Sequence, residues 1–477
     1  MSTITLKEVK ETPTTRINEI FAVQKKHQFA VGNTTAKQRI AKLKKFHKAV
    51  LKYRPEIKEA LYKDFRKHPS EVDLTEIYPI TSEIKHTKSH LREWMDNQSV
   101  KTPLALMGSS SYIHHEPKGV VLIIAPWNFP VNLTFAPLVS AIAAGNTVMI
   151  KPSEMTPNTS EVMQKIIDEI FDTNEVALVQ GGVETSKALL ALPFNHIFFT
   201  GSPQIGKIVM GAAAKHLTSV TLELGGKSPT IIDETADVEV AAKRTAWGKF
   251  MNNGQICIAP DYLFVHESKK EAFLSAVKKN LKMFYTEDAA KEGSYSRMVN
   301  KKHFDRVAGL VEDAVERGAK IELGGNTKWE ENYIAPTIMT NVPMDSKLMT
   351  EEIFGPILPI HSYTDLDEVI NIINGREKPL ALYIYSKSRK NTTHIMNNTR
   401  AGGSCINHNA VHFFNTNLPF GGSNNSGIGK GGGYFGFQAF SNARGVLKQN
   451  FPNALELLVP PYNDFKQKLI DLTIKWF

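Results

Sequence analysis

Cysteine is scarce in this sequence, and long apolar runs are missing. The two cysteines, at positions 257 and 405, are too few and too far apart to build a disulfide framework or a CxxC zinc site. No apolar run reaches the ~18 residues of a membrane span. The N-terminal stretch MSTITLKEVKE also lacks the apolar segment of a secretory signal. We therefore expect neither a secreted disulfide scaffold nor an integral membrane protein, and a reducing cytoplasm is the simplest compartment.

Acidic residues are outnumbered by basic ones, which gives a net charge of +9. Such an excess can indicate nucleic-acid binding. Here, however, the lysines share helical segments with a regular apolar face, as in residues 36–53, where that face consists of Ile40, Leu43, Phe46 and Val50. No nucleic-acid motif is present. The basic excess therefore predicts a solvated surface and no nucleic-acid partner.

The length of the chain and its alternation of apolar runs with helical stretches predict an α/β protein with more than one domain. At 477 residues the chain is too long for one ordinary core. Residues 14–100 have the periodicity of amphipathic helices, and short apolar runs alternate with helical stretches from residue 118 onward. The predicted strands are 118–126, 147–150, 196–200, 220–224 and 229–233, and helices are predicted at 160–171 and 203–215. This alternation is typical of βαβ units in a doubly wound sheet, with Gly225-Gly226 as a candidate domain junction.

Two glycine-rich stretches match nucleotide-binding motifs only superficially. GIGKGG (427–432) follows a loop instead of a strand and has no acidic residue about 20 positions later. GSPQIGK (201–207) is followed by Ile208, where a P-loop requires Ser or Thr for magnesium. The second stretch nevertheless joins a predicted strand to a helix, so its amides and the Ser202 hydroxyl could bind a pyrophosphate. A plain strand–helix turn is the alternative.

Cys257 lies in the stretch NNGQICIAP (252–260), among small polar residues. A structural cysteine usually packs in an apolar run. The polar flanks and Pro260 indicate a shaped loop, and a partly exposed loop cysteine is the kind that reacts as a thiolate. From this stretch alone, a reactive thiol and a buried core cysteine both stay open.

Seven blocks together resemble the aldehyde dehydrogenase superfamily in order and spacing. They are PWNFP (126–130), KPSE (151–154), FTGSPQIG (199–206), LELGGKSP (222–229), NNGQICIAP (252–260), EEIFGP (351–356) and LPFGG (418–422). The short N-terminus and the run from Ala125 to Glu154 resemble the class 3 branch, which includes fatty, aromatic and coniferyl aldehyde dehydrogenases.

The resemblance implies a Rossmann-like cofactor domain, a second α/β catalytic domain and a small oligomerisation arm. The expected limits are 1–95 and 118–225 for the NAD-binding domain and 226–425 for the catalytic domain. Residues 96–117 and 426–477 would form the arm and the C-terminal tail. Members of this branch are usually homodimers, so the same assembly is expected here.

The resemblance also assigns the chemistry. Cys257 would be the nucleophile that attacks the aldehyde, because a thiolate is the best side-chain nucleophile for this step. The side chain of Asn128 and the main-chain N–H of Cys257 would stabilise the resulting alkoxide. Glu223 would activate the water that cleaves the thioester, and its apolar strand is compatible with a raised pKa. Cys405 matches no catalytic position and is interpreted as structural.

The expected cofactor is NAD, with NADP possible, and no metal is needed. By the same resemblance, Lys151 and Glu154 would bind the adenosine ribose, Gly201 and Ser202 the pyrophosphate, and Glu352 beside Phe354 the nicotinamide ribose. A carboxylate at position 154 would repel a 2′-phosphate, whereas Lys151 would attract one. The full set of predicted cofactor residues is Trp127, Lys151, Ser153, Glu154, Gly201, Ser202, Gly206, Glu352 and Phe354.

The predicted activity is NAD(P)-dependent oxidation of medium- or long-chain aliphatic, or aromatic, aldehydes to carboxylic acids. A CoA-acylating aldehyde dehydrogenase and an inactive, crystallin-like or binding homologue are the alternatives. The tail, residues 463–477, is predicted to be a helix with Phe465, Leu469, Leu472 and Trp476 on one stripe. Its weak net charge favours docking on protein over binding to a membrane surface.

Overall fold

The computed structural model describes residues 11–452 and 454–476. Helices fill the first part of the chain, as the periodicity predicts. The helix predicted at 36–53 is α2 (Ala36–Lys52), which begins with a capping box between Thr35 and Gln38 and buries Leu43, Phe46 and Val50. The other helical elements before the first sheet are α1 (Thr14–Gly32), α3 (Arg54–Phe65), α4 (Pro69–Val72), the π-helical turn η1 (Asp73–Ile77) and α5 (Tyr78–Met95).

The first sheet has six strands in the order β17-β7-β6-β3-β4-β5, all parallel except β17. They are β3 (Val120–Ile124), β4 (Thr147–Lys151), β5 (Val176–Leu178), β6 (His196–Thr200), β7 (Ser219–Glu223) and β17 (Gly427–Ile428). Alternate residues of β3 face opposite helical layers. Val121 and Ile123 pack with α2, α5, α6 (Asn132–Ala144) and α7 (Pro157–Ile170), whereas Val120 and Leu122 pack with α1, α8 (Val183–Leu190) and α9 (Pro203–Ala214). Burial on both faces explains the continuous apolar runs.

The second sheet has seven strands in the order β10-β13-β14-β9-β8-β15-β16, and only β10 at its edge is antiparallel. They are β8 (Pro229–Ile232), β9 (Tyr262–His266), β10 (Lys320–Leu323), β13 (Thr337–Thr340), β14 (Ile357–Tyr363), β15 (Ala381–Tyr385) and β16 (Gly403–Ile406). One face is covered by α10 (Val238–Phe250) and α11 (Lys270–Tyr285). The other is covered by α12 (Lys301–Glu316), α13 (Lys347–Thr350), α14 (Leu366–Asn374) and α15 (Arg389–Asn398). A short hairpin, β11 (Thr327–Lys328) with β12 (Tyr333–Ile334), lies outside this sheet.

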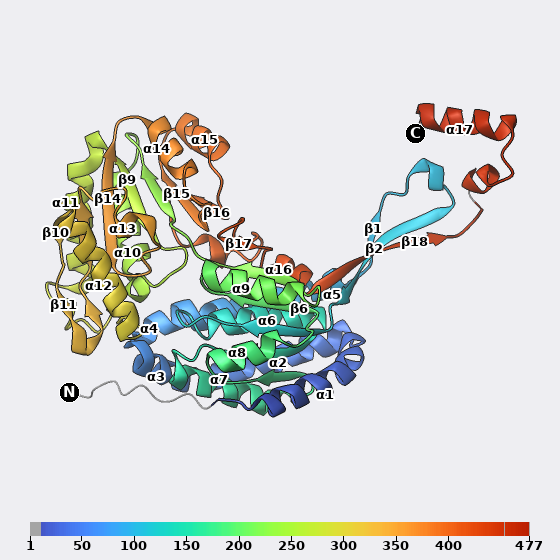
Figure 1. Cartoon of the computed structure of the whole chain (residues 1–477), viewed down its shortest axis with the longest axis horizontal. Coiled ribbons are helices and arrows are strands. Elements are labelled where there is room, and N and C mark those ends of the chain that lie inside the picture. The colour runs from blue at the N-terminus through green and yellow to red at the C-terminus, as the bar shows by residue number, and fades with distance from the viewer. Residues whose placement is uncertain (1–10, 453, 477) are drawn as a thin grey trace.

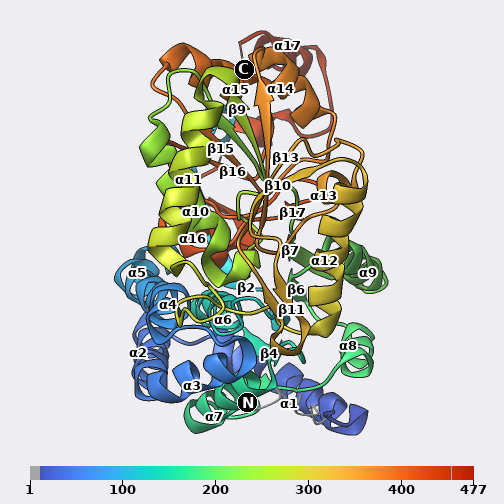
Figure 2. The same cartoon turned by 90° about the vertical axis from the view of Figure 1, so that its left-hand side faces the viewer.

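The two sheet regions lie one above the other, and a thin arm extends away from both (Figures 1 and 2). The arm is a three-stranded antiparallel sheet of β1 (Gln98–Val100), β2 (Ser109–Pro117) and β18 (Ser441–Gln449). The tail forms the turn η7 (Ala454–Leu458) and the predicted helix, α17 (Asp464–Trp476), at the far end of the arm (Figure 1). The side chain of Trp476, predicted to complete the apolar stripe, lies outside the described residues, as does residue 477. No described helix is long and apolar enough to cross a membrane.

The α/β fold predicted from the sequence is confirmed. The step from the first sheet to the second falls between the end of β7 and the start of β8, on either side of Gly225-Gly226. Part of the segment assigned to the arm and tail lies elsewhere, because β17 pairs with β7 and α16 (Gly433–Ala439) packs against α6. The domain limits stay a prediction.

Candidate active site

A mostly apolar pocket lies where the carboxyl end of β7 faces the segment that precedes β9. Cys257 and Glu223 both line it, and its empty volume, including the part open to solvent, is about 1280 Å³. Aromatic and aliphatic side chains form much of the wall, among them Phe129, Leu133, Phe198, Phe413, Phe414 and Phe420. An apolar cavity with a few convergent polar groups is the usual form of a small-molecule site.

Cys257 is presented by a loop with an unusual backbone. After α10 the chain makes the short turn η3 (Met251–Gly254), in which Asn252 and Asn253 take left-handed φ angles of 51° and 56°. Asparagine visits this region more readily than most residues. The loop then places Cys257, partly exposed, on the pocket wall. This position favours the reactive-thiol interpretation over that of a core cysteine.

The surroundings of Cys257 stabilise its neutral thiol. Burial raises the pKa of Cys257 to about 12, and the carboxylates of Glu352 and Glu223 act in the same direction. The main-chain amides of Cys257 and Ile258 oppose this by favouring the thiolate. At neutral pH the resting thiol is therefore protonated, so its proton must leave when the sulfur attacks.

Glu223, the last residue of β7, is a buried carboxyl on the pocket wall. Among the described residues, no donor satisfies either of its side-chain oxygens. Burial raises the pKa of Glu223 well above its usual value, and the charge of Lys430 only partly opposes this shift. The Lys430 ammonium donates instead to the carbonyls of Gly421 and Gly422, at 2.5 and 3.0 Å. A pocket carboxyl with a perturbed pKa is typical of a group that exchanges protons.

Asn128 follows β3 and is buried close to the cysteine loop. Its Nδ2 donates to the carbonyl of Gln255 at 3.1 Å, two residues before Cys257. A side-chain amide has two N–H protons, so this bond leaves one for another acceptor. An oxyanion formed at Cys257 is the acceptor that such a donor could serve.

Three of the predicted cofactor residues lie at the carboxyl end of β4. Lys151 is buried, and its Nζ lies 2.6 Å from Oε2 of Glu154, whose side chain is 37% exposed. Ser153 is also buried, and its Oγ accepts the N–H of Met155 at 3.2 Å. The carboxyl ends of parallel strands are where open α/β sheets bind ligands. A buried cation paired with an accessible carboxylate suits recognition of a ribose.

The segment that joins β6 to α9 contains three more of the predicted cofactor residues. The N–H of Gly201 donates to the carbonyl of Glu223 at 3.0 Å, which ties this segment to the pocket. Ser202 is the N-cap of α9, and its Oγ accepts the N–H of Ile205 at 3.4 Å. Packing explains the glycine at position 206, because an added Cβ would lie 2.7 Å from the side chain of Leu224. Ser202 therefore begins α9 at the carboxyl end of β6, and binding of a pyrophosphate by its first turn stays a prediction.

Trp127 and Phe354 are in ring contact, and Glu352 lies close enough to Cys257 for its charge to raise the pKa of the thiol. Glu352 lies against Gly225, where an added Cβ would be 2.3 Å from its Oε2. Burial raises the pKa of Glu352 to about 8, and the charge of Asp261 adds to this effect. Phe354 has a left-handed φ of 46°, and its ring meets that of Trp127 edge to face at 5.2 Å. Of the predicted site residues, Cys257 and Glu223 line the pocket itself, and the cofactor roles of the others stay a prediction.

Sequence reasoning missed the polar residues that surround this site. Lys67, Asn252 and Gln255 are buried and bonded around Asn128, and Lys430 lies near Glu223. Nothing in the sequence separates Lys67 from the many surface lysines, although the stretch NNGQ could have been identified as a strained turn.

Cys405, interpreted as structural, is buried on β16 with its Sγ 3.4 Å from His412 Nδ1. Among the described residues, no cluster of His, Cys, Asp or Glu side chains could hold a metal ion.

Comparison with known proteins agrees with the family resemblance of the seven sequence blocks. Residues 2–446 match the model of the aldehyde dehydrogenase family. A 4,4'-diaponeurosporen-aldehyde dehydrogenase of Staphylococcus aureus is 45% identical over 88% of this chain and 91% of its own length. The dimeric NADP-preferring aldehyde dehydrogenase of Rattus norvegicus is 42% identical over 89% and 93%. The structure of substrate-bound Staphylococcus aureus AldH superposes with a TM-score of 0.92 at 42% identity, covering 96% of this chain and 99% of that one. The chain therefore belongs to the aldehyde dehydrogenase family.

Proposed function

We propose that this chain oxidises aldehydes to carboxylic acids through a covalent adduct on Cys257. The thiol releases its proton to solvent as the sulfur adds to the carbonyl carbon, which gives a thiohemiacetal oxyanion. Loss of hydride from that carbon gives a thioester, and attack of water breaks the C–S bond, which releases the acid and restores the thiol by reprotonation of the sulfur. NAD or NADP, when bound, supplies the hydride acceptor. The observation that carries the proposal is the placement of Cys257 and the unpartnered Glu223 in one apolar pocket.

Asn128 and Glu223 have separate tasks in this scheme. The free N–H of the Asn128 amide stabilises the oxyanion that forms when sulfur or water adds to the carbonyl carbon. Glu223 takes the proton of the attacking water, for which a raised pKa is suited because the group must both accept and return a proton near neutral pH. The absence of a fixed partner among the described residues leaves its oxygens available for that water.

The cofactor is proposed to lie along the edge formed by β4, α9 and Glu352. The carboxylate of Glu154 is placed to accept hydrogen bonds from ribose hydroxyls, which favours NAD, and the adjacent Lys151 keeps NADP possible. Both cofactors occur among similar proteins: a Bacillus cereus aldehyde dehydrogenase is described as an NAD⁺ complex, and the rat relative is named NADP-preferring.

The substrate class is proposed from the pocket wall. Phenylalanine side chains dominate it near Cys257, and small residues extend it between α6 and α16, including Ala136, Ser140, Gly432 and Gly436. Such a wall favours medium- or long-chain aliphatic, or aromatic, aldehydes over small polar ones. The relative that acts on 4,4'-diaponeurosporen aldehyde supports a long apolar substrate.

A homodimer in the cytoplasm is the proposed setting. The rat relative is named dimeric. In this chain the arm leaves the body and exposes apolar side chains such as Leu447, Phe451 and Leu457, which a second subunit could cover (Figure 1).

The experiment that tests the function is an aldehyde panel assayed with NAD and with NADP, in the presence and absence of CoA. We expect long or aromatic aldehydes to give the highest kcat/KM, with free carboxylic acid as the product and no need for CoA. A strict requirement for CoA would favour the CoA-acylating alternative. No turnover of any aldehyde would favour the inactive, crystallin-like homologue.

A further inference from the structure

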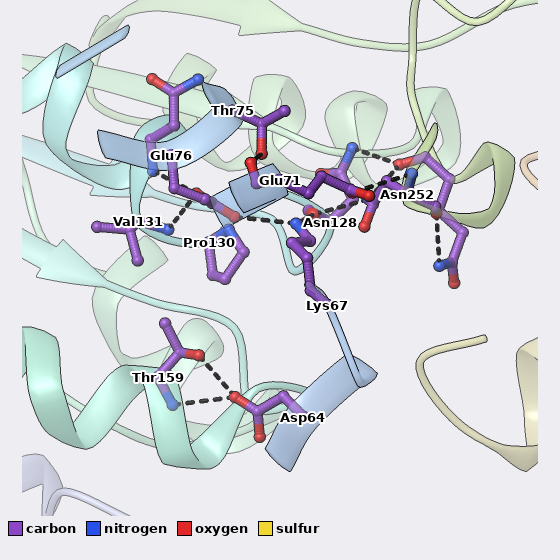
Figure 3. Close-up of polar contacts among 12 residues, drawn as sticks. Asp64, Lys67, Glu71, Thr75, Glu76, Asn128, Pro130, Val131, Thr159 and Asn252 are labelled. Atoms are coloured by element: carbon purple, nitrogen blue, oxygen red, sulfur yellow. Dashed lines mark hydrogen bonds and ion pairs between the residues drawn. The ribbon is translucent and has the colours of Figure 1, made fainter. Parts of the chain in front are cut away.

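Behind Asn128 lies a group of buried polar side chains that have no part in the proposed chemistry. Figure 3 shows Lys67, Glu71, Glu76 and Asn252 converging on this residue from two separate segments of the chain. Lys67 and Glu76 are completely buried, and Asn252 is 1% exposed. Burying charges is costly unless they are paired and fully hydrogen-bonded. The arrangement therefore needs a reason beyond filling space.

Lys67 binds the main chain of Asn128 directly. Its Nζ lies 3.1 Å from Oε1 of Glu76 and donates to the carbonyl oxygen of Asn128 at 3.2 Å. The same ammonium lies over the ring of Phe129, 4.5 Å from its centroid. Lys67 thus contacts two successive residues of the segment that carries the oxyanion donor.

Glu76 holds the other end of that segment. Its Oε2 accepts the main-chain N–H groups of Val131 and Asn132, at 3.1 and 2.8 Å. These bonds satisfy amides at the start of α6, while Oε1 faces Lys67. One buried ion pair therefore fixes the chain on both sides of Pro130.

Asn252 connects this segment to the cysteine loop. Its Nδ2 donates to the carbonyl of Asn128 at 2.9 Å and to that of Gln255 at 3.1 Å, and its N–H donates to Glu71 Oε1 at 3.0 Å. Asn128 Nδ2 donates to the same Gln255 carbonyl. The two carbonyls thus each receive two donors, and this sets the distance between the Asn128 amide and the loop that presents Cys257.

We propose that Lys67 is a positioning residue for the oxyanion donor: it orients Asn128 through its main-chain carbonyl, with Glu76 as the counter-charge. The inference rests on the proposed role of Asn128. Without Lys67, the Asn128 carbonyl keeps a single donor, and the peptide can rotate so that the side-chain amide leaves its place. A displacement of ~1 Å in an active site can cost ~10²-fold in rate.

The first test compares Lys67→Met with Asp64→Asn. Asp64 is a matched control because it is buried nearby and accepts bonds from Asn158 and Thr159 at the start of α7, apart from Asn128 (Figure 3). We expect Lys67→Met to lower kcat/KM for the aldehyde by roughly 10- to 100-fold while KM for NAD changes less than about twofold. Asp64→Asn is expected to lower Tm but to keep kcat/KM within about threefold. If Lys67→Met does not fold, Lys67→Met/Glu76→Gln removes both charges together and serves the same test.

The second test repeats the Lys67 substitution in an Asn128→Ala background. Alanine keeps the main-chain carbonyl but has no amide to position, so Lys67→Met should cost less than about threefold further. A full additional loss in this background, or a loss in Lys67→Met no larger than in Asp64→Asn, would overturn the inference. Unchanged activity in Asn128→Ala alone would instead overturn the proposed role of Asn128, so the two failures are distinguishable.

Discussion

The pocket around Glu223 and the network around Glu76 both bury a carboxyl group, but they satisfy it in opposite ways. Glu76 faces the ammonium of Lys67 and two main-chain amides. Glu223 has no hydrogen-bond partner among the described residues, although it is buried almost as deeply. Buried polar groups in folded proteins are normally bonded, so an unpartnered one needs a functional explanation. The comparison separates a carboxyl that maintains geometry from one that is kept free to react.

The largest expected effect comes from the nucleophile on the reactive side of this comparison. Cys257→Ala should abolish turnover, because no other described cysteine lies on the pocket wall, while cofactor binding measured by fluorescence titration stays intact. Cys405→Ala is the matched control and should be nearly silent. Substantial turnover in Cys257→Ala would remove this residue from the mechanism.

The two carboxyls should respond in opposite ways to the same substitution. Glu223→Gln should slow steady-state turnover by ~10²-fold or more but keep the initial burst of NADH. Its Tm should not fall, because no hydrogen bond to a described residue is lost. Glu76→Gln should lower the free energy of unfolding by about 3 kcal/mol, because Lys67 loses its counter-charge. Stopped-flow kinetics and urea unfolding of both variants check this pair. A destabilised Glu223→Gln protein with normal turnover would invert the comparison.

The pH dependence sharpens the assignment of Glu223. Burial raises the pKa of Glu223 well above its usual value, and only the ionised carboxylate can accept a proton from water. We expect kcat to rise with pH, by up to about tenfold per pH unit below the folded-state pKa, and this limb should be missing in Glu223→Gln. The raised pKa means that the folded state binds this proton more tightly than the unfolded state. Its contribution to stability is therefore full below the unperturbed pKa of 4.5 and is lost as pH rises through the folded-state pKa.

The sequence could predict the fold because the pattern of the strands is local. The run at 118–126 is apolar on both faces, which only a doubly covered parallel strand explains, and β3 has that environment. The short strand β5 was not predicted, because its three residues are too few to show a period. The return of β17 to the first sheet depends on contacts across some two hundred residues and has no local signal.

The candidate site was predictable only where a motif carried it. Cys257 and Glu223 stand in stretches whose residues are unusual for a loop and a strand. Lys67 looks like a surface lysine after a helix, and only the tertiary structure surrounds it with Glu76 and the carbonyl of Asn128. A residue that acts on its partner through a long-range contact leaves no spacing pattern in the sequence.

A smaller effect is expected at the cofactor edge, away from both carboxyls. Glu154→Ser should shift preference toward NADP by roughly tenfold, because repulsion of a 2′-phosphate disappears while Lys151 stays. Glu184→Ser is a matched control, since Glu184 forms a similar i,i+3 pair with Lys187 but is well exposed on α8. The ratio of kcat/KM with NADP to that with NAD is the measurement. An unchanged ratio would show that Glu154 does not face the ribose.

The smallest effect on catalysis is expected from the arm and tail. Unlike the regions around the two buried carboxyls, this part of the chain exposes apolar side chains. Phe465, Leu472 and Ile474 on α17 are 68%, 58% and 76% exposed, and α17 lies far from both sheets (Figure 1). Apolar groups gathered at the end of an arm are typical of a surface that docks on another chain. Truncation before Pro461 should therefore lower Tm by a few degrees or change KM for long aldehydes, with kcat for short aldehydes unaltered.

Co-sedimentation of the full chain and of the truncated chain with anionic vesicles should be equally weak, because Lys466, Lys468 and Lys475 are offset by Asp464 and Asp471. Vesicle binding that is lost on truncation, with Tm unchanged, would assign α17 to a membrane surface instead.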